Sequence, residues 1–309
     1  MPAPLRPMSL GSPVRLGTIA ALLVALAMGA PRLSDTVEAE EATAASQENS
    51  KDVAGGASPL KALLVTGGCC HDYDRQRQII ENGLTERLAD DYGRDITFDI
   101  HQGKPTREDE LALYRDPDWA ADYDIVIHNE CYGAVLDEAF VRGIVAAHER
   151  GVPGVFIHCS MHSYRDSPAA DRWRELIGVT SRRHESKHPL AVVKVDDRHP
   201  IMRDFPDVWH TEQGELYVIE KVWPRCTVLA TAYGSDTKRD HPVIWVNETG
   251  GETSARLFGT TIGHHNATME TETWLDLLAR GTLWAVGELE ESSVAANDTS
   301  GTPPNAVVD

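Results

Sequence analysis

The stretch Lys61-Ala62-Leu63-Leu64-Val65-Thr66-Gly67-Gly68-Cys69-Cys70-His71 decides the fold, because a short apolar run leads through a glycine turn to a histidine. Apolar runs of this kind are typical of central strands in a parallel sheet. Ile125–His128 and Val152–His158 repeat the pattern, and each also ends at a histidine. Segments with helical spacing follow the first and precede the last of these strands, at 77–89 and 137–148. With a further strand at Ile96–Ile100, this βαβαβαβ order predicts a doubly wound, mostly parallel α/β sheet.

The second half of the chain is less regular. Two strand-like segments, Pro242–Val246 and Arg256–Ile262, flank Gly250-Gly251 and predict an added β-hairpin. A final helix is expected over Thr271–Val286, where Trp274, Leu277 and other apolar residues share one side. Further short elements are expected as helices at Arg107–Tyr114 and Arg172–Leu176 and as strands at Leu190–Val195 and Cys226–Tyr233.

The two ends of the 309-residue chain differ in composition from its middle. A basic start followed by an uncharged apolar run at 16–28 is typical of a secretory signal, with an uncleaved anchor as the alternative. The run is shorter than the roughly 20 residues of a membrane span, so no stable span is expected. We predict an exported protein, periplasmic or secreted, with a signal peptide at 1–30, a disordered linker at 31–59, one α/β domain at 60–289 and a disordered tail at 290–309.

Charge and cysteine content narrow the class of protein. The formal net charge of −19 argues against nucleic acid or an anionic membrane surface as a partner. Five cysteines without framework spacing do not indicate a disulfide scaffold, and the adjacent Cys69 and Cys70 are not expected to bridge each other. Cys131, Cys159 and Cys226 are expected as small buried side chains. The glycine turn lacks the spacing of a nucleotide-binding loop, so no nucleotide cofactor is expected, and homo-oligomerisation stays open.

Histidines that are distant in sequence follow the predicted strands at their carboxyl ends. In an open α/β sheet these ends lie together around the ligand crevice, so His71, His158 and His264 are expected to converge there. Glu215, beside an apolar run, is expected to join them. Imidazole and carboxylate suit Zn²⁺ or another divalent metal, and the alternative is acid–base chemistry without metal. The neighbouring residues expected to contact substrate are Asn129, Tyr217 and His265.

A cysteine nucleophile is the competing prediction for the same region. Cys159 follows a strand where amidotransferases and α/β hydrolases carry their nucleophile elbow, and His210-Thr211-Glu212 imitates the amidotransferase His-x-Glu. The elbow needs small residues two positions on either side of the nucleophile, and Ile157 and Met161 stand there. A buried structural thiol is therefore the expected state of Cys159.

The chain resembles the trehalose-utilisation (ThuA-like) family, which has a class I glutamine amidotransferase-like, or flavodoxin-like, α/β fold. The resemblance covers about residues 60–288 and depends on the order of its segments. The segments are the first strand through Gly67-Gly68 to His71-Asp72, Tyr123-Asp124-Ile125-Val126-Ile127, Gly151–His158, Trp173-Arg174-Glu175-Leu176-Ile177-Gly178, Gly214-Glu215-Leu216-Tyr217, His241-Pro242-Val243-Ile244-Trp245 with Gly259–His264, and Arg280–Ala285.

This chain departs from the family pattern in the segment between Cys69 and Arg77 and at two further places. Cys159 stands where members tolerate alanine, and Gly214 replaces the Asp of the family's Asp-Glu-Leu-Tyr, whereas Glu215 is retained. The resemblance implies carbohydrate catabolism, with trehalose-like glycosides or 3-keto sugars as substrates of a hydrolase or isomerase. It also leaves a non-catalytic sugar-binding module open, for which the available stacking residues are Trp119, Tyr132, Tyr164, Trp209 and Tyr217.

Overall fold

The computed structural model describes residues 57–251 and 253–289. The predicted signal peptide, nearly all of the linker and the tail lie outside these residues. Within them, nine strands form one sheet in the order β2-β1-β3-β4-β11-β10-β9-β6-β7, and two more form a separate pair, β5-β8. The first five strands of the large sheet are mutually parallel, and they are β2 (Ile96–Gln102), β1 (Leu60–Gly68), β3 (Ile125–Cys131), β4 (Gly154–Ile157) and β11 (Arg256–Thr260).

An antiparallel extension continues the sheet beyond β11. The predicted hairpin strands pair with each other, Ile244 opposite Thr260, but β11 also pairs with β4, so the hairpin is built into the sheet. The extension consists of β10 (Arg239–Glu248), β9 (Thr227–Gly234), β6 (Ala191–Lys194) and β7 (Val208–His210). The separate antiparallel pair consists of β5 (Val179–His184) and β8 (Tyr217–Val222).

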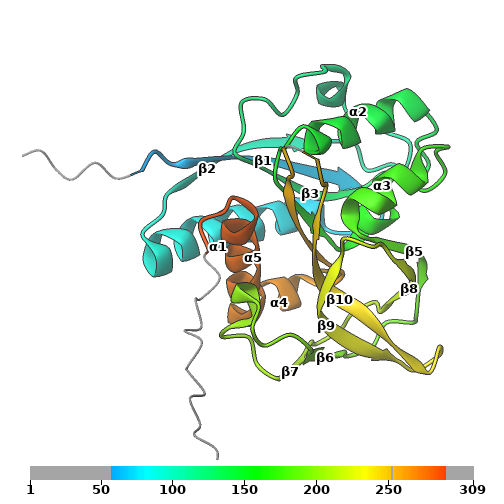
Figure 1. The fold of residues 1–309 in the computed structure, drawn as a ribbon. Coiled ribbons are helices and arrows are strands. Elements are labelled where there is room, and N and C mark those ends of the chain that lie inside the picture. The colour runs from blue at the N-terminus through cyan, green and yellow to red at the C-terminus, as the bar shows by residue number, and fades with distance from the viewer. Residues whose placement is uncertain (1–56, 252, 290–309) are drawn as a thin grey trace, which may run out of the picture. The chain divides into compact units, whose positions relative to one another are not determined.

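Helices cover both faces of the parallel strands, which confirms the doubly wound α/β class (Figure 1). Side chains alternate along β1, so Ala62 and Leu64 pack in one apolar cluster and Leu63 and Val65 in the other. Helices α1 (Tyr73–Tyr92) and α5 (Glu272–Ala285) contribute to the first cluster, and α2 (Glu138–Glu149) and α3 (Ala170–Ile177) to the second. The remaining helical elements are α4 (Asn266–Met269), η1 (Ala112–Arg115), η2 (His158–His162) and η3 (Pro200–Met202). None of the helices in the described residues has the length and apolar character to cross a membrane.

The helix expected over Arg107–Tyr114 is wrong, because only the short 3₁₀ turn η1 forms there. Side chains bind the backbone at its start: the Lys104 amide donates to Asp109 (2.9 Å) and the Glu108 amide to the Thr106 hydroxyl (3.0 Å). Such local bonds offer the backbone an alternative to the helical ladder. The segment is therefore a loop.

Candidate functional site

A histidine follows each of the parallel strands β1, β4 and β11, and the three histidines lie close together. After β1, Gly67 and Gly68 take positive φ angles (115° and 99°), and a Cβ on Gly68 would clash with the Cys131 carbonyl. The chain then turns to His71. His158 directly follows β4, and His264 follows β11 after a short loop.

Glu215 completes a cluster of four side chains. The Nε2 atom of His71 lies 3.1 Å from His264 Nδ1 and 3.1 Å from His158 Nε2. The Glu215 Oε2 atom lies 3.5 Å from His158 Nε2 and 3.4 Å from His264 Nδ1. The structure therefore brings together the four residues that the sequence predicts as ligands, with their ligand atoms within 4.8 Å of one another.

The four separations of 3.1–3.5 Å are close to those around one tetrahedral metal ion. Zn²⁺ binds imidazole nitrogen and carboxylate oxygen at about 2.0–2.2 Å, which places adjacent ligand atoms of a tetrahedron about 3.3–3.6 Å apart. His158 Nδ1 donates to the Thr261 carbonyl (2.6 Å), so the lone pair of its Nε2 faces the cluster. The donor set is thus oriented for a divalent transition metal before any ion binds.

The protonation states also favour a cation. Burial, with the nearby charges of His158 and His264, lowers the pKa of His71 to about 2. Burial likewise lowers the pKa of His158. Burial opposes ionisation of Glu215, but the adjacent imidazoles of His158 and His264 outweigh it and hold its pKa well below the usual range. At neutral pH, His71, His158 and Glu215 therefore present lone pairs and a negative charge.

His158, and not Cys159, holds the elbow position after β4. Its φ angle is 45°, a left-handed conformation that is uncommon outside glycine and enriched in Asn, Asp and His. The residues two positions away are then Phe156 and Ser160, and Cys159 is bonded to Cys131. The sulfur of Cys159 is therefore no free nucleophile in this structure.

Two disulfides correct the expectation of unbridged cysteines. Cys131 and Cys159 are bonded across 28 residues, because the ends of β3 and β4 bring their Cα atoms to 5.3 Å. The adjacent residues Cys69 and Cys70 form the second disulfide, and Cys70 has a positive φ angle (86°). Cys226 stays free, as a half-buried thiol.

Removing the Cys131–Cys159 bridge is expected to lower the free energy of unfolding by roughly 2–4 kcal/mol, because the bridge restricts a long loop of the unfolded chain. The test is urea denaturation, without reductant, of a double variant with Cys131→Ala and Cys159→Ala. Cys226→Ala, which lies outside both bridges, serves as the control. Equal midpoints for the double variant and wild type would contradict the stabilising role.

A pocket of about 340 Å³ opens beside the cluster. His71 and Glu215 line it, together with Tyr217, whose hydroxyl lies 3.4 Å from His158 Nε2. Sequence reasoning missed His162, which stacks on the Tyr217 ring at 4.0 Å, and His184, whose Nε2 lies 3.6 Å from Glu215 Oε2. The four-residue spacing of His158 and His162 was an available signal for the first, and nothing in the sequence singles out the second.

The other two predicted substrate contacts lie elsewhere. Asn129 is buried, and its amide donates to Gln76 (3.3 Å), which in turn donates to the Gly263 carbonyl (3.1 Å). This chain of bonds ties β3 and α1 to the loop before His264. His265 is exposed, caps α4, and lines a second hollow of about 400 Å³ that shares Cys70 and His71 with the first pocket.

His128 does not join the cluster, although it follows the same sequence pattern. The strand β3 continues to Cys131, so His128 lies inside it and faces the opposite side of the sheet. Its Nδ1 lies 2.9 Å from Glu130 Oε1 and its Nε2 lies 3.0 Å from His148 Nε2. All three side chains are fully buried, and burial with the nearby His128 lowers the pKa of His148 to about 3. This second network is a structural one.

The aromatic side chains expected to stack on a sugar are buried. Trp119, Tyr132, Tyr164, Trp209 and Tyr217 are all at most 9% exposed. Of these, Tyr217 alone is among the residues that line the pocket beside the histidines. These five residues therefore form no open stacking surface, which the alternative of a sugar-binding module would require.

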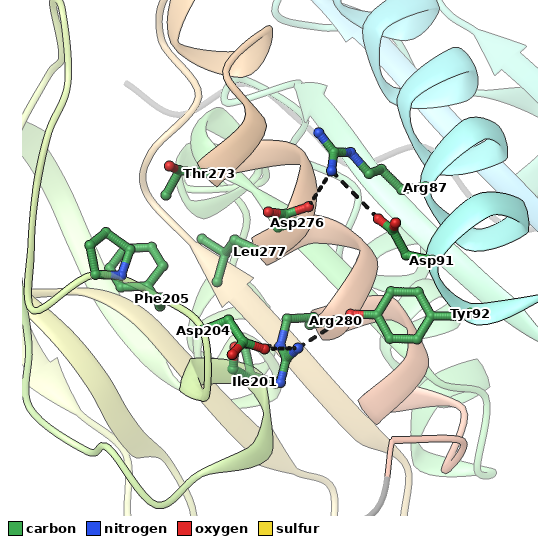
Figure 2. A pocket seen from close by; sticks show the side chains of 11 residues that line it. Arg87, Asp91, Tyr92, Ile201, Asp204, Phe205, Thr273, Asp276, Leu277 and Arg280 are labelled. Atoms are coloured by element: carbon green, nitrogen blue, oxygen red, sulfur yellow. Dashed lines mark hydrogen bonds and ion pairs between the residues drawn. The ribbon is translucent and has the colours of Figure 1, made fainter.

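A larger cavity of about 490 Å³ lies between α1, α5 and the loop that follows η3 (Figure 2). Its arginines are already neutralised: Arg87 contacts Asp91 and Asp276, and Arg280 contacts Asp204 at 2.9 Å. Arg280 also donates to the Ile201 carbonyl (3.0 Å). The charged groups in this cavity connect the helices and the loop, so few unpaired charges are left to bind a ligand.

Comparisons with known proteins indicate the same family as the ordered sequence segments described above. The family model described as trehalose utilisation (ThuA) matches residues 62–285. A ThuA-like protein from Parabacteroides merdae is 20% identical, with a TM-score of 0.58 over 75% of this chain and 92% of its own. A ThuA-like protein from Bacteroides uniformis is 16% identical, with a TM-score of 0.55 over 75% and 94%. No curated protein matches the chain. Over the matched residues, the chain belongs to the trehalose-utilisation (ThuA) family.

Proposed function

We propose that the protein is an exported enzyme of carbohydrate catabolism, which acts on a glycoside or a 3-keto sugar at a mononuclear metal centre. His71, His158, Glu215 and His264 are the proposed ligands, and Zn²⁺ is the first candidate ion. The observation that carries the proposal is the set of 3.1–3.5 Å separations between their ligand atoms at the wall of a pocket. Membership of the trehalose-utilisation family supports the substrate class, and the apolar run near the N-terminus supports export.

The chemistry assigns different roles to the residues of the pocket. A divalent ion supplies Lewis acidity, which polarises a sugar carbonyl or activates water. His184 is positioned to move a proton: its Nδ1 donates to the Glu185 carbonyl (2.8 Å), so its Nε2 is directed away from that bond and lies 3.6 Å from Glu215. Hydrolysis of a glycoside and proton abstraction beside a keto group both need such an acid–base group.

Metal analysis of the purified protein tests the centre. After expression in metal-replete medium we expect close to one equivalent of a divalent transition metal, because imidazole nitrogen and carboxylate oxygen are donors that such ions prefer. Turnover of a panel of glucosides and 3-keto-glucosides should fall on chelation and return with Zn²⁺. A metal content below ~0.1 equivalent would remove the metal from the proposal, given the tight binding of such sites.

A further inference from the structure

We propose that the sugar bound in the His71–Glu215 pocket carries an acidic group, a carboxylate, sulfate or phosphate, which is held by Arg107 and Arg165. This inference rests on the proposed function, since it names the substrate class of the same site. The chain as a whole has a formal net charge of −19, yet four arginines line this pocket: Arg107, Arg165, Arg182 and Arg183. The single carboxylate among its lining residues, Glu215, already interacts with the histidines.

Arg107 and Arg165 converge on one point. A Cβ on Gly133 would lie 3.2 Å from Arg165 Nε and 3.5 Å from Arg107 Nη2. The absence of a side chain at Gly133 thus leaves room for both guanidinium groups beside the same point of the backbone. Two like charges near one point repel, and an anion between them reduces the repulsion.

Neither of these guanidinium groups has an acidic partner within residues 57–251 and 253–289. Arg183 likewise forms no ion pair with any residue that the structure describes, whereas Arg182 contacts Glu220 at 2.8 Å. The cavity of Figure 2 shows the opposite arrangement, because Arg87 and Arg280 are both bound to aspartates there. Unpaired arginines in a pocket are the usual device for binding carboxylate and phosphate, since the planar guanidinium presents two donors side by side.

Backbone hydrogen bonds hold the loops that carry both arginines. The Ala134 amide donates to the Arg107 carbonyl (2.9 Å), and the Asp166 amide donates to the Gly133 carbonyl (3.1 Å). These bonds join the loops that carry Arg107 and Arg165 to the loop after β3. The arginines and the histidine cluster line the same pocket of about 340 Å³, within the size range of ligand sites, so one saccharide can contact both.

Direct binding to the metal-loaded protein tests the proposal. Titration calorimetry compares glucuronate, glucose 6-sulfate and glucose 6-phosphate with neutral glucose and methyl glucoside, with inorganic sulfate and phosphate as separate arms. We expect at least one acidic sugar to bind about ten- to a hundredfold more tightly than the neutral sugars, as charge-assisted hydrogen bonds imply. The arm that binds best identifies the acidic group.

Arg165→Gln and Arg107→Gln should each remove about tenfold or more of that preference, and Arg165→Lys should restore part of it. Arg172→Gln, which removes an exposed arginine paired with Glu149, is the matched control and should change nothing. Equal binding of acidic and neutral sugars, binding unaffected by both glutamine variants, or free sulfate or phosphate binding as tightly as every acidic sugar would each overturn the proposal. Metal content is measured in parallel, so failure of the metal centre is recognised separately from failure of the anion site.

Discussion

His158→Asn is expected to yield a folded protein that binds Zn²⁺ at least about tenfold more weakly, because even groups behind the ligands of a metal site are worth roughly 10–100-fold in affinity. The loss in kcat/KM is expected to be at least about tenfold too, because the rate should follow the metal content. Asparagine is the informative substitution, since it tolerates the left-handed conformation (φ 45°) at this position and keeps the backbone turn. Metal content, kcat/KM and the unfolding midpoint should be measured together.

His101→Asn is the matched control for that experiment, because it makes the same change at an exposed position on β2. It should keep the metal, the rate and the midpoint of wild type. A His158→Asn protein with full metal content and full activity would exclude His158 from the centre. A protein that loses metal but keeps activity would leave the ligand assignment intact and remove the metal from the chemistry.

Glu130→Ala is expected to lower the free energy of unfolding by roughly 3–5 kcal/mol, the usual cost of removing one partner of a buried pair. Glu130 is fully buried, and its Oε1 is 2.9 Å from His128 Nδ1 and 3.4 Å from the Tyr114 and Tyr164 hydroxyls. Alanine removes the buried carboxylate that these three polar groups share. Urea denaturation at neutral pH measures the change.

Glu130→Gln should recover only part of this loss. The Nδ1–H of His148 is committed to the Val152 carbonyl (2.8 Å), so His128 must supply the proton between the two Nε2 atoms. With glutamine, the amide can donate to His128 Nδ1 while His128 Nε2 still donates to His148, but the hydrogen bonds lose the charge of the carboxylate. Glu149→Ala, at an exposed ion pair, is the control and should cost less than about 1 kcal/mol. A loss at Glu130→Ala no larger than at Glu149→Ala would contradict the structural role of the buried network.

The fold could be predicted because the strands and helices leave clear periodic signals. The apolar run at Lys61–Thr66 and the helical spacing over Thr271–Val286 correspond closely to β1 and α5. The sequence could not show where β3 ends. Its buried apolar residues are followed directly by buried polar residues, with no glycine or proline to mark a turn. The strand continues for three residues beyond His128. His128 therefore lies within the strand, where side chains alternate between the two faces of the sheet, and it points away from the histidine cluster.

The site was predictable only where its residues follow strands. His71, His158 and His264 share that position, and the topology of a parallel sheet brings such residues together. Arg107, Arg165 and His184 come from loops or from the small β5–β8 pair, whose placement depends on tertiary contacts. The Cys131–Cys159 disulfide was missed for the same reason, because its cysteines are brought together by neighbouring strand ends 28 residues apart in the chain.

The pairing of β11 with β4 has a consequence for synthesis of the protein on the ribosome. The bond from His158 to the Thr261 carbonyl spans 103 residues, and His264 lies further on still. A nascent chain that ends before β11 can form the earlier parallel strands and their helices but lacks one imidazole and the carbonyl that orients another. The proposed metal centre therefore cannot be completed until nearly the whole domain has been translated.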